Sequence, residues 1–326
     1  MLRMDGFRYH DAQSYAEALG VFSTNEGAMY VAGGTDLLPN TKHGLFRPKV
    51  LVGLGGIAGY IRDQGDTIGI GATTKLQAIA DHPLVQTMLD PLAQAAAVVA
   101  GPQIRNMGTL GGNVLLDTRC VYYNQTEAWR KALGYCLKAE GDWCHVIGGP
   151  KTCVAAQSSD TVPVLLALGA RLRLLNPSGE REVAIRDVYR FDGMDHLSIQ
   201  KGELLTEIVV PKPAAGVRGS YQKLRTRDSI DFPQLGLAVC GSFDGVVPLA
   251  LDIVVGAVNP QPKAIRGLDA FLGAPMDEAA IDTICDLVYK QTRPQASVHG
   301  DAAWRRQMAV VFTRRALVNL RTRRSA

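Results

Sequence analysis

The sequence predicts an α+β protein built from two parts. Its 326 residues exceed the usual size of one hydrophobic core. Short strand-like and helix-like segments alternate through the first two thirds of the chain, whereas longer strands followed by helices occupy the last third. The Pro/Gly-rich stretch VPKPAAGVRG, residues 210–219, separates these regions. We therefore expect one domain over residues 1–214 and a second, an antiparallel sheet with helices, over residues 217–326.

The elements of the first part follow from local patterns. An amphipathic helix is expected at residues 14–22, and apolar runs predict buried strands at 28–34 and 48–54. Residues 66–85 have the pattern of a strand that leads into a helix. The turn sequence NPSG lies between two alternating segments, so residues 170–185 are expected to form a hairpin. A further strand at 203–213 ends at two prolines.

The second part has longer apolar segments. Strands are expected at residues 221–227, 234–243 and 250–258, followed by helices from Ile265 onward. Cys240 and Cys285 lie in apolar segments, where a thiol is usually a small core side chain. In the arginine-rich segment 304–324, Met308, Val311 and Phe312 recur at helical spacing. Its arginines form either a solvated outer face or a docking surface for an acidic partner.

Composition excludes several classes of protein. The net charge of +4 is modest, and no module of basic and aromatic residues indicates nucleic-acid binding. No apolar run approaches the roughly 20 residues that span a membrane. The N-terminal residues lack the pattern of a secretory signal, so we expect a cytoplasmic protein.

Two glycine-rich stretches are candidates for phosphate binding. Residues 31–37, VAGGTDL, place two glycines after a buried strand and before a helix-like segment with Thr35 and Asp36 as candidate N-caps. Residues 101–113, GPQIRNMGTLGGN, are the second stretch. Glycines allow backbone N–H groups to converge on a phosphate, although each stretch alone is also compatible with a tight turn. A third match, GLGGIA at 53–58, is rejected because another strand, and not a helix, is expected to follow it.

Four of the six cysteines lie in one polar stretch. Cys120, Cys136, Cys144 and Cys153 are separated by 15, 7 and 8 residues. In a reducing compartment such a set is more often metal-binding or catalytic than disulfide-bonded. The gaps fit a zinc ribbon poorly, because zinc sites usually contain closely spaced pairs of ligands. Iron–sulfur, zinc and unligated thiols remain open, and polar neighbours such as Glu140 and Lys138 indicate a surface position.

These motifs together resemble the flavin-binding subunits of the molybdenum hydroxylases, over nearly the whole chain. VAGGTDLLP and GPQIRNMGTLGGN are similar to the two FAD loops of that family. SSDTVPVLLALGA (158–170), GELLTEIVVP (202–211) and YQKLRTRDSIDF (221–232) are similar to three further segments near the flavin. The resemblance implies a two-part FAD-binding domain of the PCMH type, followed by a C-terminal domain like that of the CO dehydrogenase flavoprotein. It implies FAD contacts at Val31, Ala32, Gly33, Gly34, Thr35, Asp36, Leu37, Ala100, Thr109, Gly112, Asn113, Asp160, Leu205 and Lys223.

One departure from the family pattern is large. In most relatives fewer than ten residues separate the glycine–asparagine pair from the aspartate segment, whereas 46 residues lie between Asn113 and Asp160 here. An insertion of about residues 116–156 that carries four cysteines resembles the branch of the family formed by 4-hydroxybenzoyl-CoA reductases. That resemblance implies a [4Fe–4S] cluster held by Cys120, Cys136, Cys144 and Cys153.

The same resemblance implies a function and partners. The chain would pass electrons from ferredoxin through FAD towards [2Fe–2S] centres and a molybdenum cofactor on separate subunits. There 4-hydroxybenzoyl-CoA would be reductively dehydroxylated, so no catalytic residue is expected on this chain. Two alternatives remain: a flavin subunit of a related hydroxylase with another substrate and outward electron flow, and a zinc-stapled binding protein without enzymatic activity.

Overall fold

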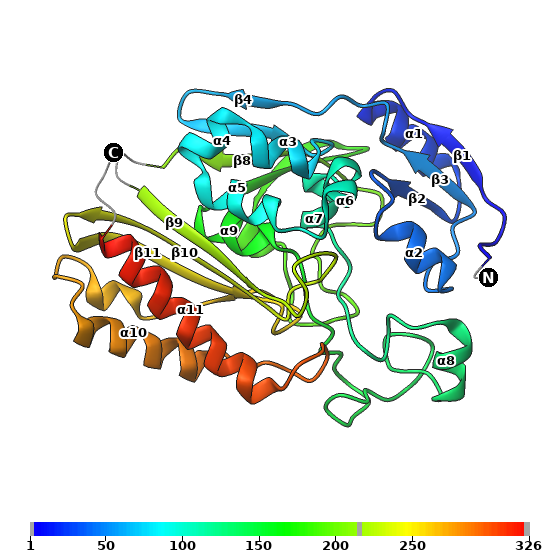
Figure 1. Ribbon diagram of the computed structural model, residues 1–326. Helices are drawn as coiled ribbons and strands as arrows, with labels where there is room; N and C mark the ends of the chain where they lie inside the picture. Colours follow the sequence, from blue (N-terminus) through cyan, green and yellow to red (C-terminus); the bar gives the residue numbers. More distant parts are fainter. Residues whose placement is uncertain (1–2, 214–216, 323–326) are drawn as a thin grey trace.

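The computed structural model describes residues 3–213 and 217–322. Three sheets and their helices form an α+β architecture, which confirms the predicted fold class (Figure 1). The expected boundary at residues 214–216 lies outside the described residues. Among the helices that are described, none combines the length and the apolar character needed to cross a bilayer.

The N-terminal sheet is small and parallel, with strand order β1-β3-β2. Helix α1 contacts β2 and β3, and Ser14 caps its N-terminus by accepting a hydrogen bond from the Glu17 N–H. The bounds are β1 Arg8–Asp11, α1 Tyr15–Thr24, β2 Ala28–Val31, α2 Leu37–Lys42 and β3 Val50–Gly53. As expected, the rejected glycine pattern after β3 leads into another strand, β4, and not into a helix.

The second sheet is antiparallel, with order β4-β5-β8-β6-β7. The predicted hairpin is confirmed, because β6 and β7 pair with Asn176 opposite Gly179. Short helices pack around the core that this sheet builds with Ile68, Ile70 and Leu172. The strands are β4 Ile61–Asp63, β5 Thr67–Gly71, β6 Arg171–Asn176, β7 Gly179–Ala184 and β8 Leu204–Pro211. The helices are α3 Leu76–Asp81, α4 Pro83–Met88, α5 Asp90–Ala97, α6 Pro102–Met107, α7 Leu110–Val114 and α9 Thr161–Ala167.

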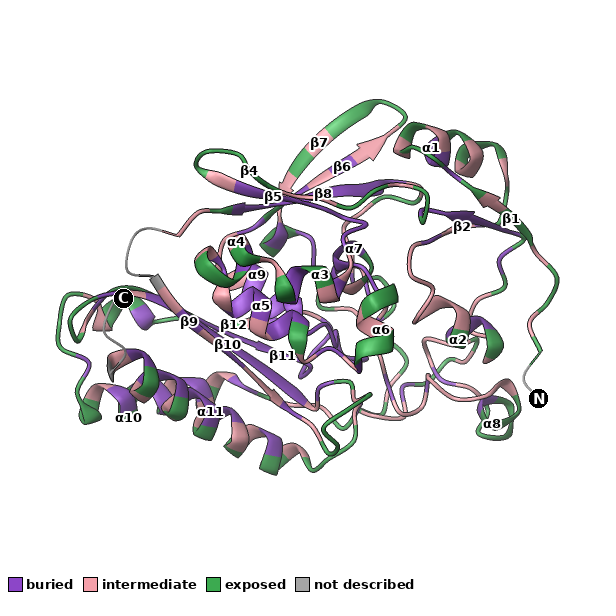
Figure 2. Ribbon diagram, turned by 45° about the horizontal axis from the view of Figure 1, so that its top comes forward, coloured by how far each residue is buried: buried purple, intermediate pink, exposed green. Residues whose placement is uncertain are grey.

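The C-terminal sheet is antiparallel, with order β12-β11-β10-β9. Helices α5 and α9 contact it from the first domain, while α10 and α11 form an outer helical layer (Figures 1 and 2). The elements are β9 Val217–Leu224, β10 Leu235–Asp244, β11 Val247–Gly256, β12 Lys263–Ala264, α10 Glu278–Gln291 and α11 Ala302–Thr322.

The sequence predicted the wrong bounds for two elements of this domain, the first strand and the start of the first helix. Strand β9 begins before residue 221 and ends at Leu224, because the chain then turns into a loop. The first α-helix begins only at Glu278; residues 268–271 form a short 3₁₀ turn. Gly273, at φ 75°, and Pro275 prevent a continuous helix from the 3₁₀ turn to α10. Asp277 then caps α10 by accepting a hydrogen bond from the Ala280 N–H.

The two ends of the cysteine-bearing insertion meet where the insertion leaves and rejoins the first part of the chain. Arg119 and Ala156 form an antiparallel bridge, with both N–H to O distances at 2.8 Å. Between them lies helix α8, Glu127–Ala132, whose buried Arg130 donates to the His43 carbonyl near α2. The surface position expected for Lys138 was wrong: its side chain is 6% exposed, because its ammonium group pairs with Asp117.

The arginine-rich segment forms α11 as expected, and Cys240 and Cys285 are buried. Val311 is more exposed than its apolar spacing predicted, whereas Phe312 and Leu317 lie in the core. Arg314 forms ion pairs with Asp282 and Glu278 of α10, which gives this arginine an intramolecular role. Residues 323 and 324 of the segment lie outside the described residues.

Arg305 is the largest fully buried side chain of the described residues, and it fastens the start of α11. Its guanidinium donates to the carbonyls of Gln234 at 2.8 Å, Gln295 at 2.9 Å and Ala257 at 2.8 Å. Burial lowers its pKa to about 10. One cation thus satisfies three backbone acceptors from separate loops.

Replacing Arg305 with Met should lower the free energy of unfolding by about 3 kcal/mol, because three backbone carbonyls, one of them buried and two partly buried, lose their donors. Urea denaturation followed by circular dichroism measures this loss. Arg315→Met, an exposed arginine on the same helix, is the matched control and should change stability by less than about 0.5 kcal/mol. Equal effects of the two substitutions would contradict the assignment.

Glu203 fastens the β6–β7 hairpin to the turn before β8. Its carboxylate is 1% exposed and accepts from Arg181 Nε and Nη2, both at 2.7 Å, and from the Gln200 N–H at 2.8 Å. Hydrogen bonding from Arg181, the largest cause, lowers the pKa of Glu203 to about 2.

Because the folded-state pKa lies below the ordinary value, the stability from Glu203 is present above pH 4.5 and is lost as the pH falls towards 2. This contribution is at most about 3 kcal/mol. Glu203→Gln should therefore unfold with a weaker acid dependence than the wild type in urea titrations between pH 6 and pH 3. Glu180→Gln, on the exposed edge of the same hairpin, should keep the wild-type dependence; parallel curves for all three proteins would refute the interpretation.

Candidate functional site

A cavity of about 480 Å³ lies where the two glycine stretches meet strand β8. Its volume is within the usual range for small-molecule and cofactor sites. The walls come from the loop between β2 and α2, the segment that joins α6 and α7, the chain after α7, and the start of β8. Phe232, from the loop between β9 and β10, adds one side chain of the second domain.

The first glycine loop requires both of its glycines. A Cβ on Gly33 would lie 2.1 Å from the Met107 carbonyl oxygen, so a side chain there would force the two glycine stretches apart. Gly34 has φ +69°, in the left-handed region that favours glycine. Asp36 occupies the N-cap position of α2, but its side chain does not cap the helix; it accepts from Arg119 at 2.8 Å and from Asn40 at 3.0 Å.

The second glycine loop forms the short helix α7. Thr109 caps it by accepting from the Gly112 N–H at 3.1 Å. A Cβ on Gly111 would meet Ala72 at 2.8 Å, whereas a Cβ on exposed Gly112 would have only the Thr109 hydroxyl near it, at 3.2 Å. Packing within the protein therefore does not require glycine at position 112, and a side chain there would have room on the side of the loop that faces the cavity.

Twelve of the fourteen residues expected at the flavin line this one cavity. They are Val31, Ala32, Gly33, Gly34, Thr35, Asp36, Leu37, Ala100, Thr109, Gly112, Asn113 and Leu205. Asn113 also reaches away from it, because its Oδ1 accepts from the hydroxyls of Ser159 at 2.6 Å and Thr161 at 2.7 Å.

The other two, Asp160 and Lys223, do not line the cavity. They form a buried ion pair at 2.9 Å, and the Tyr221 hydroxyl donates to Asp160 at 2.8 Å. Burial raises the pKa of Asp160, and Lys223 opposes that shift. Lys223 also donates to the Val98 carbonyl at 3.0 Å, directly before the lining residues Val99 and Ala100.

Sequence reasoning missed several polar residues of the cavity wall. Thr73 and Asp117 line it, and their atoms Oγ1 and Oδ2 are buried and have no hydrogen-bond partner in the described structure. Glu203 and His196 also line it. Glu203 lies in the segment 202–211 that the sequence places near the flavin, but only Leu205 was selected from it. Thr73, Asp117 and His196 lie outside the predicted flavin segments, so no local signal in the sequence could identify them.

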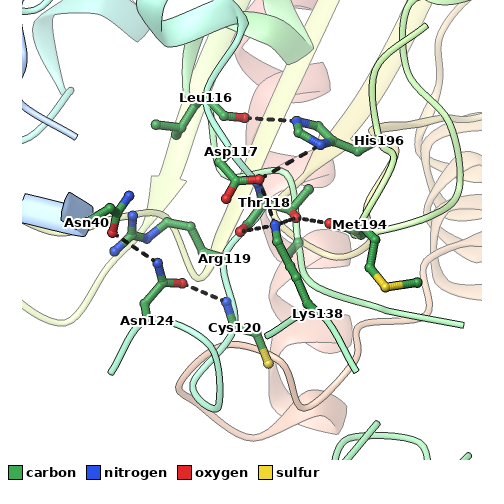
Figure 3. A network of polar contacts seen from close by, with 12 residues as sticks. Asn40, Leu116, Asp117, Thr118, Arg119, Cys120, Asn124, Lys138, Met194 and His196 are labelled. Carbon is green, nitrogen blue, oxygen red and sulfur yellow. Dashed lines mark hydrogen bonds and ion pairs between the residues drawn. The ribbon is translucent and has the colours of Figure 1, made fainter. Parts of the chain in front are cut away.

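A polar network joins this wall to the insertion (Figure 3). Lys138 donates to Asp117 Oδ1 at 2.6 Å and to the Thr118 carbonyl at 3.0 Å. His196 lies on the other side, with Nδ1 4.0 Å from Asp117 Oδ1 and Nε2 3.2 Å from the Leu116 carbonyl. Burial lowers the pKa of His196, which favours the neutral ring.

The four clustered cysteines are all buried, and none is in a disulfide. Cys120, Cys136 and Cys153 pack in one small core with Tyr123. The pKa of Cys120 is raised to about 12 and that of Cys153 to about 11, mainly because both thiols are buried. Neighbouring thiols raise these pKa values further; Cys144 has this effect on Cys153. Within residues 3–213 and 217–322, no three His, Cys, Asp or Glu side chains are close enough to hold a single metal ion.

The comparisons with known proteins agree with this geometry. Residues 5–213 match the family described as the FAD binding domain in molybdopterin dehydrogenase, and residues 219–320 match the CO dehydrogenase flavoprotein C-terminal domain. The carbon monoxide dehydrogenase medium chain of Afipia carboxidovorans is 30% identical over 322 residues, 97% of each chain. The aldehyde oxidoreductase FAD-binding subunit of Escherichia coli is 30% identical over 292 residues, 86% of this chain and 90% of that one.

Solved structures show the same fold over the whole length. Reconstituted CO dehydrogenase from Oligotropha carboxidovorans superposes with a TM-score of 0.80 at 28% identity, covering 99% of this chain and 100% of that one. Both domains are thus matched in sequence and in structure. The chain belongs to the family of FAD-binding subunits of the molybdenum hydroxylases.

Proposed function

We propose that this chain holds FAD in the cavity between the two glycine loops and serves as the electron-transfer subunit of a molybdenum enzyme. The observation that carries the proposal is the convergence of twelve expected flavin residues on one cavity. FAD exchanges one or two electrons when bound, so it can connect one-electron carriers with two-electron chemistry. The protein's contribution is to bind, orient and enclose the cofactor.

The residues present fit a dinucleotide. Gly33 and Gly34 leave backbone where side chains would otherwise stand, so the chain at this loop can approach a phosphate closely. The first N–H groups of α7 are already used, because Leu110 donates to Thr74, Gly111 to Ala72 and Gly112 to Thr109. The unpartnered Thr73 hydroxyl and Asp117 carboxylate oxygen can accept hydrogen bonds from the hydroxyl or amine groups of the ligand. The first glycine loop therefore offers backbone to a phosphate, and polar lining side chains can recognise a sugar or a base.

We propose a positioning role for Asp160 and Lys223 in place of direct contact. Their ion pair is fully enclosed, and Lys223 holds the carbonyl of Val98. The next residues, Val99 and Ala100, line the cavity, and Ala100 has the unusual φ of 42°. The pair therefore supports a strained part of the cavity wall from behind.

For the insertion we propose a [4Fe–4S] cluster held by Cys120, Cys136, Cys144 and Cys153. Three of the four thiols, those of Cys120, Cys136 and Cys153, pack in one small core, and the sequence gaps of 15, 7 and 8 residues fit a zinc ribbon poorly. An iron–sulfur cluster is larger than one ion and can take ligands from separate turns of a loop, so these sequence gaps favour it over zinc. Burial raises the pKa of the Cys120 and Cys153 thiols, so cluster assembly must release their protons.

We propose that the complete enzyme reductively dehydroxylates 4-hydroxybenzoyl-CoA. Ferredoxin is the proposed electron donor, and separate subunits hold the molybdenum cofactor and the [2Fe–2S] centres. The cysteine-bearing insertion supports this choice, and a cytoplasmic location belongs to it. The alternative is a hydroxylase subunit with another substrate and outward electron flow, which the likeness to CO dehydrogenase and aldehyde oxidoreductase chains favours. Identification of the co-purifying subunits and their substrate separates the two.

Gly112→Val should abolish FAD binding without unfolding the domain. The valine meets no protein atom within 4 Å of its Cβ except the Thr109 hydroxyl at 3.2 Å, so only the ligand is displaced. We expect flavin content to fall at least about tenfold, while the melting temperature of the flavin-free protein stays within a few degrees of the wild type. Gly55→Val is the control, because Gly55 has no atom near its Cβ and lies outside the cavity lining. Full flavin content in folded Gly112→Val would place the cofactor elsewhere.

Serine in place of Cys136 or Cys144 should remove or convert the cluster while FAD stays bound, since neither cysteine lines the cavity. Iron and acid-labile sulfide analysis, with EPR of the dithionite-reduced protein, measures the loss. Cys285→Ser, in the core of the second domain, should keep the full iron content. Zinc in the wild type, or full iron content in both cluster variants, would disprove the cluster.

A further inference from the structure

The flavin cavity has an unusual balance of charge. Its lining includes three carboxylates, Asp36, Asp117 and Glu203, and His196. No lysine or arginine of residues 3–213 or 217–322 is among the lining residues. The pyrophosphate of FAD is itself anionic, and uncompensated carboxylates in the same low-dielectric cavity would repel it.

Each carboxylate is neutralised by a cation that stands outside the lining. Arg119 pairs with Asp36 at 2.8 Å, Lys138 with Asp117 at 2.6 Å, and Arg181 with Glu203 at 2.7 Å. The three cations hold the carboxylates in place and cancel their charge without occupying the cavity.

Two of these cations belong to the cysteine-bearing insertion. Arg119 lies at its base, where it forms the bridge with Ala156, and Lys138 lies two residues after Cys136. Lys138 is the more enclosed, at 6% exposure, with its donors directed to Asp117, to the Thr118 carbonyl and to the Thr118 hydroxyl at 2.5 Å (Figure 3). Its ammonium group also lies 4.4 Å from the centre of the Tyr123 ring.

We propose that the insertion is part of the flavin site, and that Lys138 is a positioning residue which neutralises Asp117 and so sets the affinity for FAD. The inference rests on the proposed location of FAD in this cavity, but it is independent of whether the cysteines bind iron. Lys138 does not touch the cavity. Its effect passes through Asp117, whose second oxygen is buried in the wall without a partner.

Lys138 gives a cleaner test than Arg119. Arg119 also stacks on Phe232, with its guanidinium carbon 3.7 Å from the ring centre, so replacing it would alter charge and packing together. Loss of the Lys138 charge leaves mainly an uncompensated carboxylate at Asp117. Removing that carboxylate as well should restore the charge balance of the cavity and with it the affinity for FAD. If Lys138→Met acted by damaging the packing, the second substitution would not restore the affinity.

The experiment is a double-mutant cycle on the full-length chain, read out as the FAD dissociation constant from flavin fluorescence. Lys138→Met should weaken FAD binding on the order of tenfold, and Lys138→Arg should weaken it less. The double variant Lys138→Met, Asp117→Asn should return to within about threefold of the wild type. Lys131→Met, an exposed lysine of the same insertion, is the matched control and should bind FAD normally.

A double variant that binds FAD as weakly as Lys138→Met would overturn the proposal, and so would wild-type affinity in Lys138→Met itself. Should Lys138→Met fail to fold, comparison of the double variant with the wild type still decides. Equal affinities sustain the charge mechanism, and a tenfold loss refutes it. The Gly112→Val variant distinguishes failure of this inference from failure of the proposed function. If Gly112→Val still binds FAD, the location of FAD in this cavity is wrong. If Gly112→Val loses FAD while Lys138→Met binds it normally, only the role of Lys138 is wrong.

Discussion

The site depends on the close approach of two backbone segments that are far apart in the sequence. Gly33 stands so near the Met107 carbonyl that the smallest side chain would separate them. Thr109 and Lys75 form an isolated bridge, which holds the second loop against the turn between β5 and α3. The parallel sheet that positions the first loop and the antiparallel sheet that positions the second are thus joined where the cavity begins.

The insertion extends this arrangement and does not stand apart from it. Its ends meet at the Arg119–Ala156 bridge, and its interior contributes a buried cation and four buried thiols. A surface loop usually has little effect on the site that it flanks. Here the inward direction of Lys138 connects the loop to Asp117 in the cavity wall, so the two candidate cofactor sites share one electrostatic environment.

Much of this organisation was predictable from the sequence because the signals are local. Glycine after a buried strand, a turn sequence between alternating segments, and clustered cysteines each have a physical meaning within a few residues. The pairing of Asp160 with Lys223, the three cations outside the cavity and the burial of Arg305 were not predictable in this way. Each joins residues from different elements, and a charged residue in an irregular segment gives no local indication of the direction in which it points.

The enclosed contact among Tyr221, Asp160 and Lys223 also crosses the boundary between the domains, since Asp160 precedes α9 and its partners lie on β9. Moving the domains apart would expose hydrophobic surface and leave a buried charge without its counter-ion, which opposes hinge opening. A cofactor in the cavity could therefore exchange only by a route that leaves this contact closed, and, among the residues described, the lining loop with Phe232 is the one element of the second domain that local movement could displace.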